Sequence, residues 1–288
     1  MKKSLVFKKY RNLKIGFSTH SFQKTVPLNV SGITELIEYA SNEGYHFMEV
    51  RDPQVDLSND DCKALAVIAI MNKIDIIYVF NKNMLDSGFN DFFERGLENA
   101  IIFPGPGILR TLVSKSEFDE NPERKGWNKE ELVHITNLSE SCAYKARSKN
   151  IHFIVENCNE AFFGDNLTYF GLTNFLENAV GTDLQLDIGN LFSNTNRVDN
   201  DPDKVFKYLK TLKNRWVETH LKTIQNGEPQ AILTDNPLPV EKIVDLMGKQ
   251  NVLYLTLELA AVDGKDQCFD NLASSIQFLR FKGILKSK

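Results

Sequence analysis

The chain has 288 residues and a formal net charge of −4, enough length for one large core and no basic excess of the kind that nucleic-acid binders show. No apolar run reaches the ~18 residues of a membrane span, and the basic start of the chain lacks the apolar region of a secretory signal. We therefore expect a cytoplasmic protein with no nucleic-acid or membrane partner, although an export signal already removed would leave no trace in this sequence. The four cysteines form no CxxC pair, which favours free thiols.

Short apolar runs alternate with helical patterns along the whole chain. In chain order we predict strands over Leu13–Ser18, Phe47–Val50, Ile74–Phe80, Ala100–Phe103, Ile151–Glu156, Leu184–Asp187, Trp216–Leu221 and Val252–Glu258. Helix signals between them predict a helix capped by Ser31 and closed by Gly44, one that begins after Asn128, and helices over Asp203–Leu212 and Pro239–Met247, the last closed by Gly248. Strands that alternate with helices indicate a parallel sheet with right-handed crossovers.

Eight such units favour closure into a (β/α)₈ TIM barrel, a single domain over residues 1–288 with a core of about 13–282. The competing fold is an open doubly wound sheet, but no GxGxxG follows the first predicted strand. Three long segments follow predicted strands: Pro104–Lys129, Phe192–Pro202 and Thr223–Leu238. We expect them on the face where barrel enzymes place their sites, as walls of a substrate pocket or as an oligomer contact.

Four successive apolar runs close on a carboxylate or an imidazole: Glu156, Asp187, His220 and Glu258. The intervals between these residues are 31, 33 and 38, each about the length of one βα repeat. Residues that close consecutive strands of a parallel barrel converge on one face. Three carboxylates and one imidazole would meet there, and such a set favours a divalent metal.

Fragments in the same order are found in a known group of proteins. They are KIGFS from Lys14, GYHFMEV from Gly44, FPG from Phe103, VEN from Val155, DIGN from Asp187, THLK from Thr219 and LE from Leu257. With these the chain resembles the xylose isomerase-like TIM barrel superfamily, which includes the sugar phosphate isomerases and epimerases. The resemblance implies that Glu156, Asp187, His220 and Glu258 bind one divalent cation, most often Mn²⁺ or Mg²⁺, with Co²⁺ or Zn²⁺ as alternatives. It also implies that Glu156 and Glu258 are the acid/base pair.

The chain departs from this superfamily at four positions. Asn190 stands where many members have a histidine, and Thr223 stands where many have an aspartate. The endonuclease IV branch has metal-binding histidines after strands two and three, where this chain has Glu49 and Asn81. The absence of histidines at Glu49 and Asn81 argues against a trinuclear zinc site and therefore against DNA repair.

The donor set suits chemistry beside a carbonyl group. Four protein ligands in an octahedral shell leave two positions for a hydroxyketone, whose enediolate the metal would stabilise as a Lewis acid. The predicted substrate-binding residues are His20, Glu49, Asn81, Asn190 and Lys222. Alternatives remain: Asp187 could cap the following helix, His220 could be a core histidine, and Lys222 could point outward.

The sequence therefore predicts a metal-dependent sugar isomerase or epimerase in carbohydrate metabolism, acting on a small ketose, aldose or keto-polyol. A keto-polyol dehydratase with the same metal site and a non-catalytic sugar-binding barrel are the alternatives. No Gly-rich phosphate loop is present to indicate a phosphorylated substrate. The sequence leaves open whether the protein forms a homo-oligomer.

Overall fold

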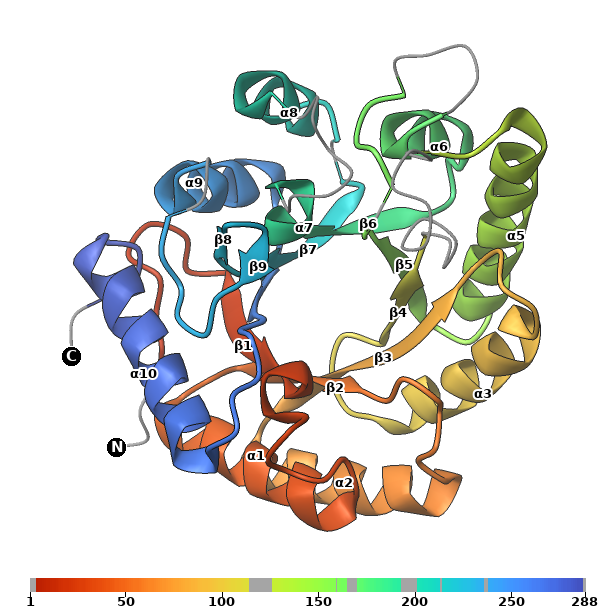
Figure 1. The fold of residues 1–288 in the computed structure, drawn as a ribbon. Coiled ribbons are helices and arrows are strands. Elements are labelled where there is room, and N and C mark those ends of the chain that lie inside the picture. The colour runs from red at the N-terminus through yellow and green to blue at the C-terminus, as the bar shows by residue number, and fades with distance from the viewer. Residues whose placement is uncertain are drawn as a thin grey trace.

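The computed structural model describes residues 4–113, 126–158, 160–164, 170–192, 201–212, 214–235 and 238–286. Residues 114–125, 193–200 and 236–237 of the predicted long segments lie outside this range. The described strands form a closed parallel barrel in the order β1-β10-β7-β6-β5-β4-β3-β2, with the helices around its outside (Figure 1). The predicted single-domain (β/α)₈ fold is confirmed. Phe7 and Leu285 form an antiparallel bridge, so the start and the end of the described chain lie side by side.

The barrel strands are β1 Lys14–Ser18, β2 Phe47–Arg51, β3 Asp75–Asn83, β4 Ile108–Leu112, β5 His152–Glu156, β6 Asp183–Asp187, β7 Trp216–Leu221 and β10 Tyr254–Leu257. The helices are η1 Thr19–Phe22, α1 Val30–Glu43, α2 Asn59–Asn72, α3 Phe89–Ile102, α5 Lys129–Arg147, α6 Leu172–Asn178, α7 Ile188–Phe192, α8 Pro202–Leu209, α9 Val240–Gln250 and α10 Lys265–Phe281. A two-stranded hairpin, β8 Ile224–Gln225 with β9 Glu228–Pro229, follows β7. None of the described helices is both long and apolar enough to cross a membrane.

The fourth predicted strand is wrong. Residues 100–102 end helix α3, and the strand that pairs with β3 and β5 is Ile108–Leu112. Phe93, Leu97 and Ala100 are buried at helical spacing, whereas Ile101 is 47% exposed, a pattern that fits one helix face rather than a strand buried on both sides. Gly105 and Gly107 then adopt positive φ angles of 127° and 62° in the turn into β4. The segment Pro104–Gly107 therefore precedes the fourth strand instead of following it.

Helix ends differ from prediction at three places. Asn29, not Ser31, caps α1, because its side chain accepts from the Gly32 amide, while Gly44 closes the helix with φ of 86° as predicted. Helix α8 begins at Pro202 after the cap Asp201 and ends at Leu209, three residues before the predicted end at Leu212. Gly248 lies inside α9 and does not end it, and a Cβ at Gly248 would collide with the Tyr10 ring that packs there.

Helix α9 instead ends at Asn251, whose φ of 58° is the left-handed conformation that asparagine tolerates. Helix α5 follows its prediction, with Asn128 and Glu131 forming a reciprocal capping box. Asparagine and aspartate side chains thus cap the starts of α1, α5 and α8.

The barrel interior is layered. An apolar cluster fills the end where the strands begin, and its buried members are Phe47, Ile77, Val79, Ile108, Ile154 and Tyr254. The next inward positions along the strands are polar: Glu49 in β2, Arg110 in β4, Glu218 in β7 and Thr256 in β10, all fully buried. This alternation follows the period of two along each strand. Polar side chains therefore occupy the half of the interior nearest the carboxyl ends of the strands.

Candidate active site

Four predicted ligands come together at the carboxyl ends of their strands. Glu156 ends β5, Asp187 ends β6, His220 lies in β7 and Glu258 follows β10 directly. Each offers one ligand atom such that all four atoms lie within 4.8 Å of one another, and all four residues are buried. The parallel register explains this convergence, since Asp187 pairs with His220 across β6 and β7.

The imidazole of His220 lies at the centre of the group. Its Nδ1 is 3.3 Å from Glu258 Oε2, 3.6 Å from Glu156 Oε1 and 3.9 Å from Asp187 Oδ2. His220 Nδ1 is buried without a hydrogen bond of good geometry, whereas Asp187 Oδ2 is buried in contact with the Lys222 ammonium. A buried polar atom without a hydrogen bond is uncommon and points to a ligand. The donor set and the unsatisfied His220 nitrogen fit a divalent cation of the Mn²⁺ or Mg²⁺ type.

Asp187 also caps a helix, which the sequence analysis gave as the alternative to metal binding. Its Oδ1 accepts from the Asn190 amide at 2.7 Å, so one oxygen caps the short helix α7 while the other faces the cluster. Asn190 in turn donates from Nδ2 to the Asn157 carbonyl at 3.0 Å, and Asn157 brackets the Asp187 backbone with two hydrogen bonds. These contacts fix the direction of the Asp187 carboxylate.

A lysine and an arginine also reach the cluster. Lys222 Nζ lies 2.6 Å from Asp187 Oδ2 and 2.8 Å from Glu258 Oε2, and the residue is 9% exposed. Lys222 therefore points inward, and the alternative that it points to solvent is wrong. Arg51 Nη1 lies 3.3 Å from Glu258 Oε1. Glu258 is thus held by a cation on each of its oxygens.

A fully buried ion network lies beneath the cluster. Glu49 Oε1 accepts from Ser18 Oγ at 2.7 Å and from Arg110 Nη2 at 3.2 Å, and its Oε2 is 2.8 Å from His220 Nε2. Arg110 Nη1 donates to Glu156 Oε2. With Nε2 bound to Glu49, the other ring nitrogen of His220 is turned toward the carboxylates. A carboxylate behind a ligating histidine is a common way to orient such a ring.

Burial and neighbouring charges set opposite pKa shifts in this network. Burial raises the pKa of Glu156 to about 7 against the opposing charges of Arg110 and His220. Burial also acts on Glu49, but the charges of His220 and Arg110 outweigh it and lower its pKa to about 2. Burial disfavours the charged form of His220, yet Glu49 and Glu258 hold its pKa well above the usual value. The pKa of Glu258 is well below its usual value because Lys222 and His220 outweigh burial.

The remaining predicted substrate residues surround the cluster less tightly. His20 follows β1, its Nδ1 is buried without a hydrogen bond, and burial lowers its pKa to about 4. The Asn81 side-chain oxygen, in the amide orientation that satisfies both groups, accepts from Arg51 Nε at 2.7 Å. Glu49 differs from both, because it is 0% exposed and both of its oxygens are bound to protein groups. Its position places it behind His220.

Three charged residues of the network were missed in the sequence: Arg51, Arg110 and Glu218. Arg110 follows the apolar Ile108 by two positions, and Glu218 precedes His220 by two, so period-two counting along each strand would have placed both inside the barrel. Glu218 Oε1 accepts from Thr256 Oγ1, its Oε2 has no hydrogen bond, and burial raises its pKa to about 7. Arg110 was hidden because the fourth strand was placed too early.

Neither a family model nor a curated protein sequence matches the chain. Solved structures do match it. A D-psicose 3-epimerase, crystallised in the presence of D-fructose, is 14% identical with a TM-score of 0.67, over 93% of this chain and 99% of that one. A sugar phosphate isomerase/epimerase from Parabacteroides distasonis ATCC 8503 is 13% identical with a TM-score of 0.69, over 95% of both chains.

The chain shares their fold. An AP endonuclease of family 2 from Brucella melitensis also matches, at 14% identity and a TM-score of 0.59, over 91% of this chain and 97% of that one. The barrel predicted from the sequence resemblance is thereby confirmed at the level of fold. The same fold carries different reactions in these proteins, so function has to be argued from the site.

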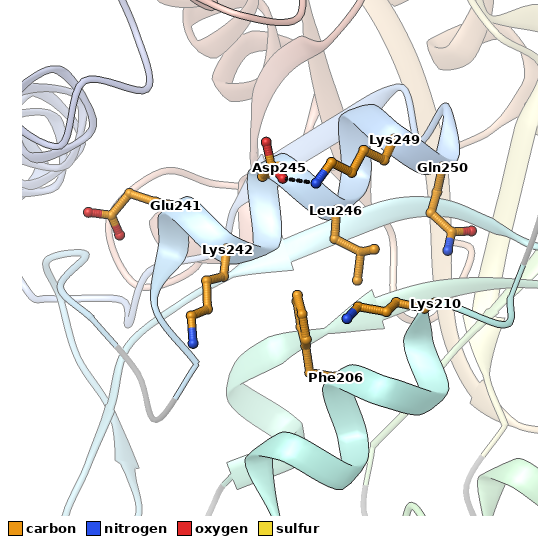
Figure 2. A pocket seen from close by; sticks show the side chains of 8 residues that line it. All are labelled: Phe206, Lys210, Glu241, Lys242, Asp245, Leu246, Lys249 and Gln250. Carbon is orange, nitrogen blue, oxygen red and sulfur yellow. Dashed lines mark ion pairs between the residues drawn. The ribbon is translucent and has the colours of Figure 1, made fainter.

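A large surface hollow lies away from this cluster. It has a volume of about 670 Å³ and lies between helices α8 and α9 on the outside of the barrel (Figure 2). Phe206 and Leu246 face each other across it, with Lys210, Lys242 and Lys249 around them. This hollow is open and holds no set of converging catalytic groups. The converging titratable groups of the buried cluster, and not this hollow, therefore mark the candidate active site.

Proposed function

We propose that the chain is a divalent-metal-dependent sugar isomerase or epimerase that moves a proton on the carbon beside the carbonyl of a small ketose, aldose or keto-polyol. The observation that carries the proposal is the four-residue set whose ligand atoms lie within 4.8 Å of one another at the carboxyl end of the barrel. The names of the similar structures, a psicose 3-epimerase and an L-ribulose 3-epimerase among them, support a sugar as the substrate.

Glu156, Asp187, His220 and Glu258 would hold the cation. When bound, it would polarise the substrate carbonyl and stabilise the negative charge that develops on its oxygen. Manganese and magnesium suit this oxygen-rich set best. Glu49 supports the site from behind, because its bond to His220 Nε2 fixes the ring orientation.

The two glutamates would move the proton. Arg51 holds Glu258 at one oxygen and Arg110 holds Glu156 at one oxygen, so each carboxylate has a fixed position. A base acts efficiently only when it is held within hydrogen-bond reach of the carbon acid. One glutamate would remove the proton from one face of the substrate carbon, and the other would return a proton to the opposite face.

Substrate hydroxyl groups need polar partners at the rim of this cluster. His20 offers a buried Nδ1 with no hydrogen bond, and Asn81 lies beside Arg51. Asn190 is half-buried next to Asp187, and Lys222 brings a positive charge to the same place. We assign these four residues to substrate binding.

Proton exchange with solvent tests the proposal without knowledge of the natural substrate. The Mn²⁺-loaded protein is incubated in D₂O with D-psicose, D-tagatose and L-ribulose, and deuterium at the carbons beside the carbonyl is followed by NMR. We expect deuterium uptake and a new sugar from at least one of them. A Glu258→Gln variant should lose both, whereas Glu94→Gln, in an exposed ion pair with Lys145, should keep both.

The products separate the competing functions. A sugar of the same mass identifies an isomerase or epimerase, and a product lighter by one water identifies a dehydratase. Sugar binding in calorimetry with no exchange for any sugar of the panel would contradict the proposal and favour a binding barrel. Full exchange in Glu258→Gln would remove Glu258 from the role of base.

A further inference from the structure

Lys222 occupies the place of a cation inside the candidate metal centre. Its ammonium touches Asp187 Oδ2 at 2.6 Å and Glu258 Oε2 at 2.8 Å, and these two carboxylates belong to the four-residue ligand set. Both acids are buried, Asp187 completely. A buried carboxylate needs a positive partner. Lys222 is such a partner for two of the three carboxylates, Asp187 and Glu258, at the same time.

The fold makes room for the lysine in this position. Gly189, in α7, lies against the Lys222 stem, and a Cβ at residue 189 would lie 2.9 Å from Lys222 Cε and closer still to its Cγ. The side chain of Lys222 is therefore packed along a surface that only a glycine leaves open. This packing indicates that the inward position is built into the sequence and is not a chance orientation of a flexible lysine.

We propose that Lys222 is an internal counter-ion that competes with the divalent cation for Asp187 and Glu258, and that metal binding displaces its ammonium from at least one of them. An ammonium and a divalent ion that share the same two oxygens would be two like charges a few ångströms apart, which is strongly unfavourable at a buried site. The lysine thus sets a threshold for metal loading and keeps the metal-free barrel stable. This inference rests on the proposed metal-dependent function.

Calorimetric titration of Mn²⁺ into the metal-free protein tests the competition directly. The wild type is compared with Lys222→Met, which removes the ammonium and keeps the stem. If the metal-competent arrangement is populated to about 10% or less in the wild type, the variant should bind Mn²⁺ at least about tenfold more tightly. Lys82 lies in β3 with its ammonium over the Phe92 ring. Lys82→Met is the matched control, because it removes the same charge elsewhere in the barrel. Its affinity should stay within about twofold of wild type.

A second measurement uses the wild-type chain and does not depend on whether Lys222→Met folds. Reductive methylation of Lys222 is followed by mass spectrometry with and without Mg²⁺. Displacement of the ammonium from its carboxylates should make Lys222 react faster when Mg²⁺ is bound. A rate that is unchanged or slower would overturn the proposal.

The outcomes separate this inference from the proposed function. Equal or weaker Mn²⁺ binding by Lys222→Met, with wild-type binding intact, overturns the competition and leaves the metal centre standing. Absence of Mn²⁺ binding in both proteins overturns the metal centre and the inference with it. Tighter binding in Lys222→Met together with an unchanged Lys82→Met supports the inference.

Discussion

Replacement of Arg110 by methionine should destabilise the protein strongly. Arg110 is 0% exposed and lies between Glu49 and Glu156, which are themselves buried. Methionine has a similar length and no charge, so the two carboxylates would lose their shared partner without a large cavity. Removal of one partner from a buried ion pair costs about 3–5 kcal/mol.

At roughly 2–4 °C per kcal/mol for chains of this size class, the expected fall in Tm is about 6–20 °C. The assay is thermal unfolding in EDTA, so that metal bound by Glu156 does not contribute. The control is Lys145→Met, which also removes a cation from an ion pair, but the Lys145–Glu94 pair is about half exposed. Exposed pairs contribute about 0–1 kcal/mol, so this variant should unfold within about 4 °C of wild type.

A double variant identifies the cause of the loss. Glu156→Gln added to Arg110→Met removes one of the stranded charges and should recover part of the Tm. The reasoning is refuted if Arg110→Met is as stable as Lys145→Met, or if the added Glu156→Gln lowers the Tm further. Either result would mean that the buried carboxylates do not depend on Arg110 for their charge balance.

Two further predictions concern packing and thiol chemistry. Gly16→Ala in β1 would bring a Cβ within 2.5 Å of the Phe47 carbonyl oxygen and 2.7 Å of its ring. We expect the free energy of unfolding in urea to fall by about 1–3 kcal/mol. A stability equal to wild type would contradict this close approach. Burial raises the pKa of the Cys62 and Cys142 thiols to about 12, so both stay protonated at pH 8. Iodoacetamide should label both thiols slowly in the native protein and rapidly in guanidinium, and the native labelling rate should rise about tenfold per pH unit up to pH 10. Native labelling within minutes at pH 8 would be inconsistent with their burial.

The fold was predictable wherever a strand was short, apolar and bounded by turn residues. Strands β5, β6 and β7, which carry Glu156, Asp187 and His220, were placed within one residue of their observed bounds. A polar residue at the end of an apolar run marks the point where a buried strand reaches the barrel mouth. The prediction of the fourth strand was wrong because it relied on the same signal, a short apolar run. Residues 100–103 form an equally apolar short run, and such a run cannot be told from the end of a buried helix by composition.

The four candidate ligands could be brought together from sequence because the period of a βα repeat determines which residues share a barrel end. The network around them could not. The Glu49–Arg110–Glu156 chain joins β2, β4 and β5, and no spacing along the sequence encodes that three-way contact. The inward position of Lys222 also depends on the room left by Gly189, which becomes visible only when α7 and β7 are packed together.

The central claim is that Glu156, Asp187, His220 and Glu258 form one divalent-cation centre. It is tested most directly by counting Mn²⁺ bound at equilibrium to the wild type and to an Asp187→Ala, His220→Ala double variant, with circular dichroism to confirm that both are folded. We expect about one equivalent per chain in the wild type and none in the double variant. A folded wild type that binds no Mn²⁺, or a double variant that binds as much as wild type, would contradict it.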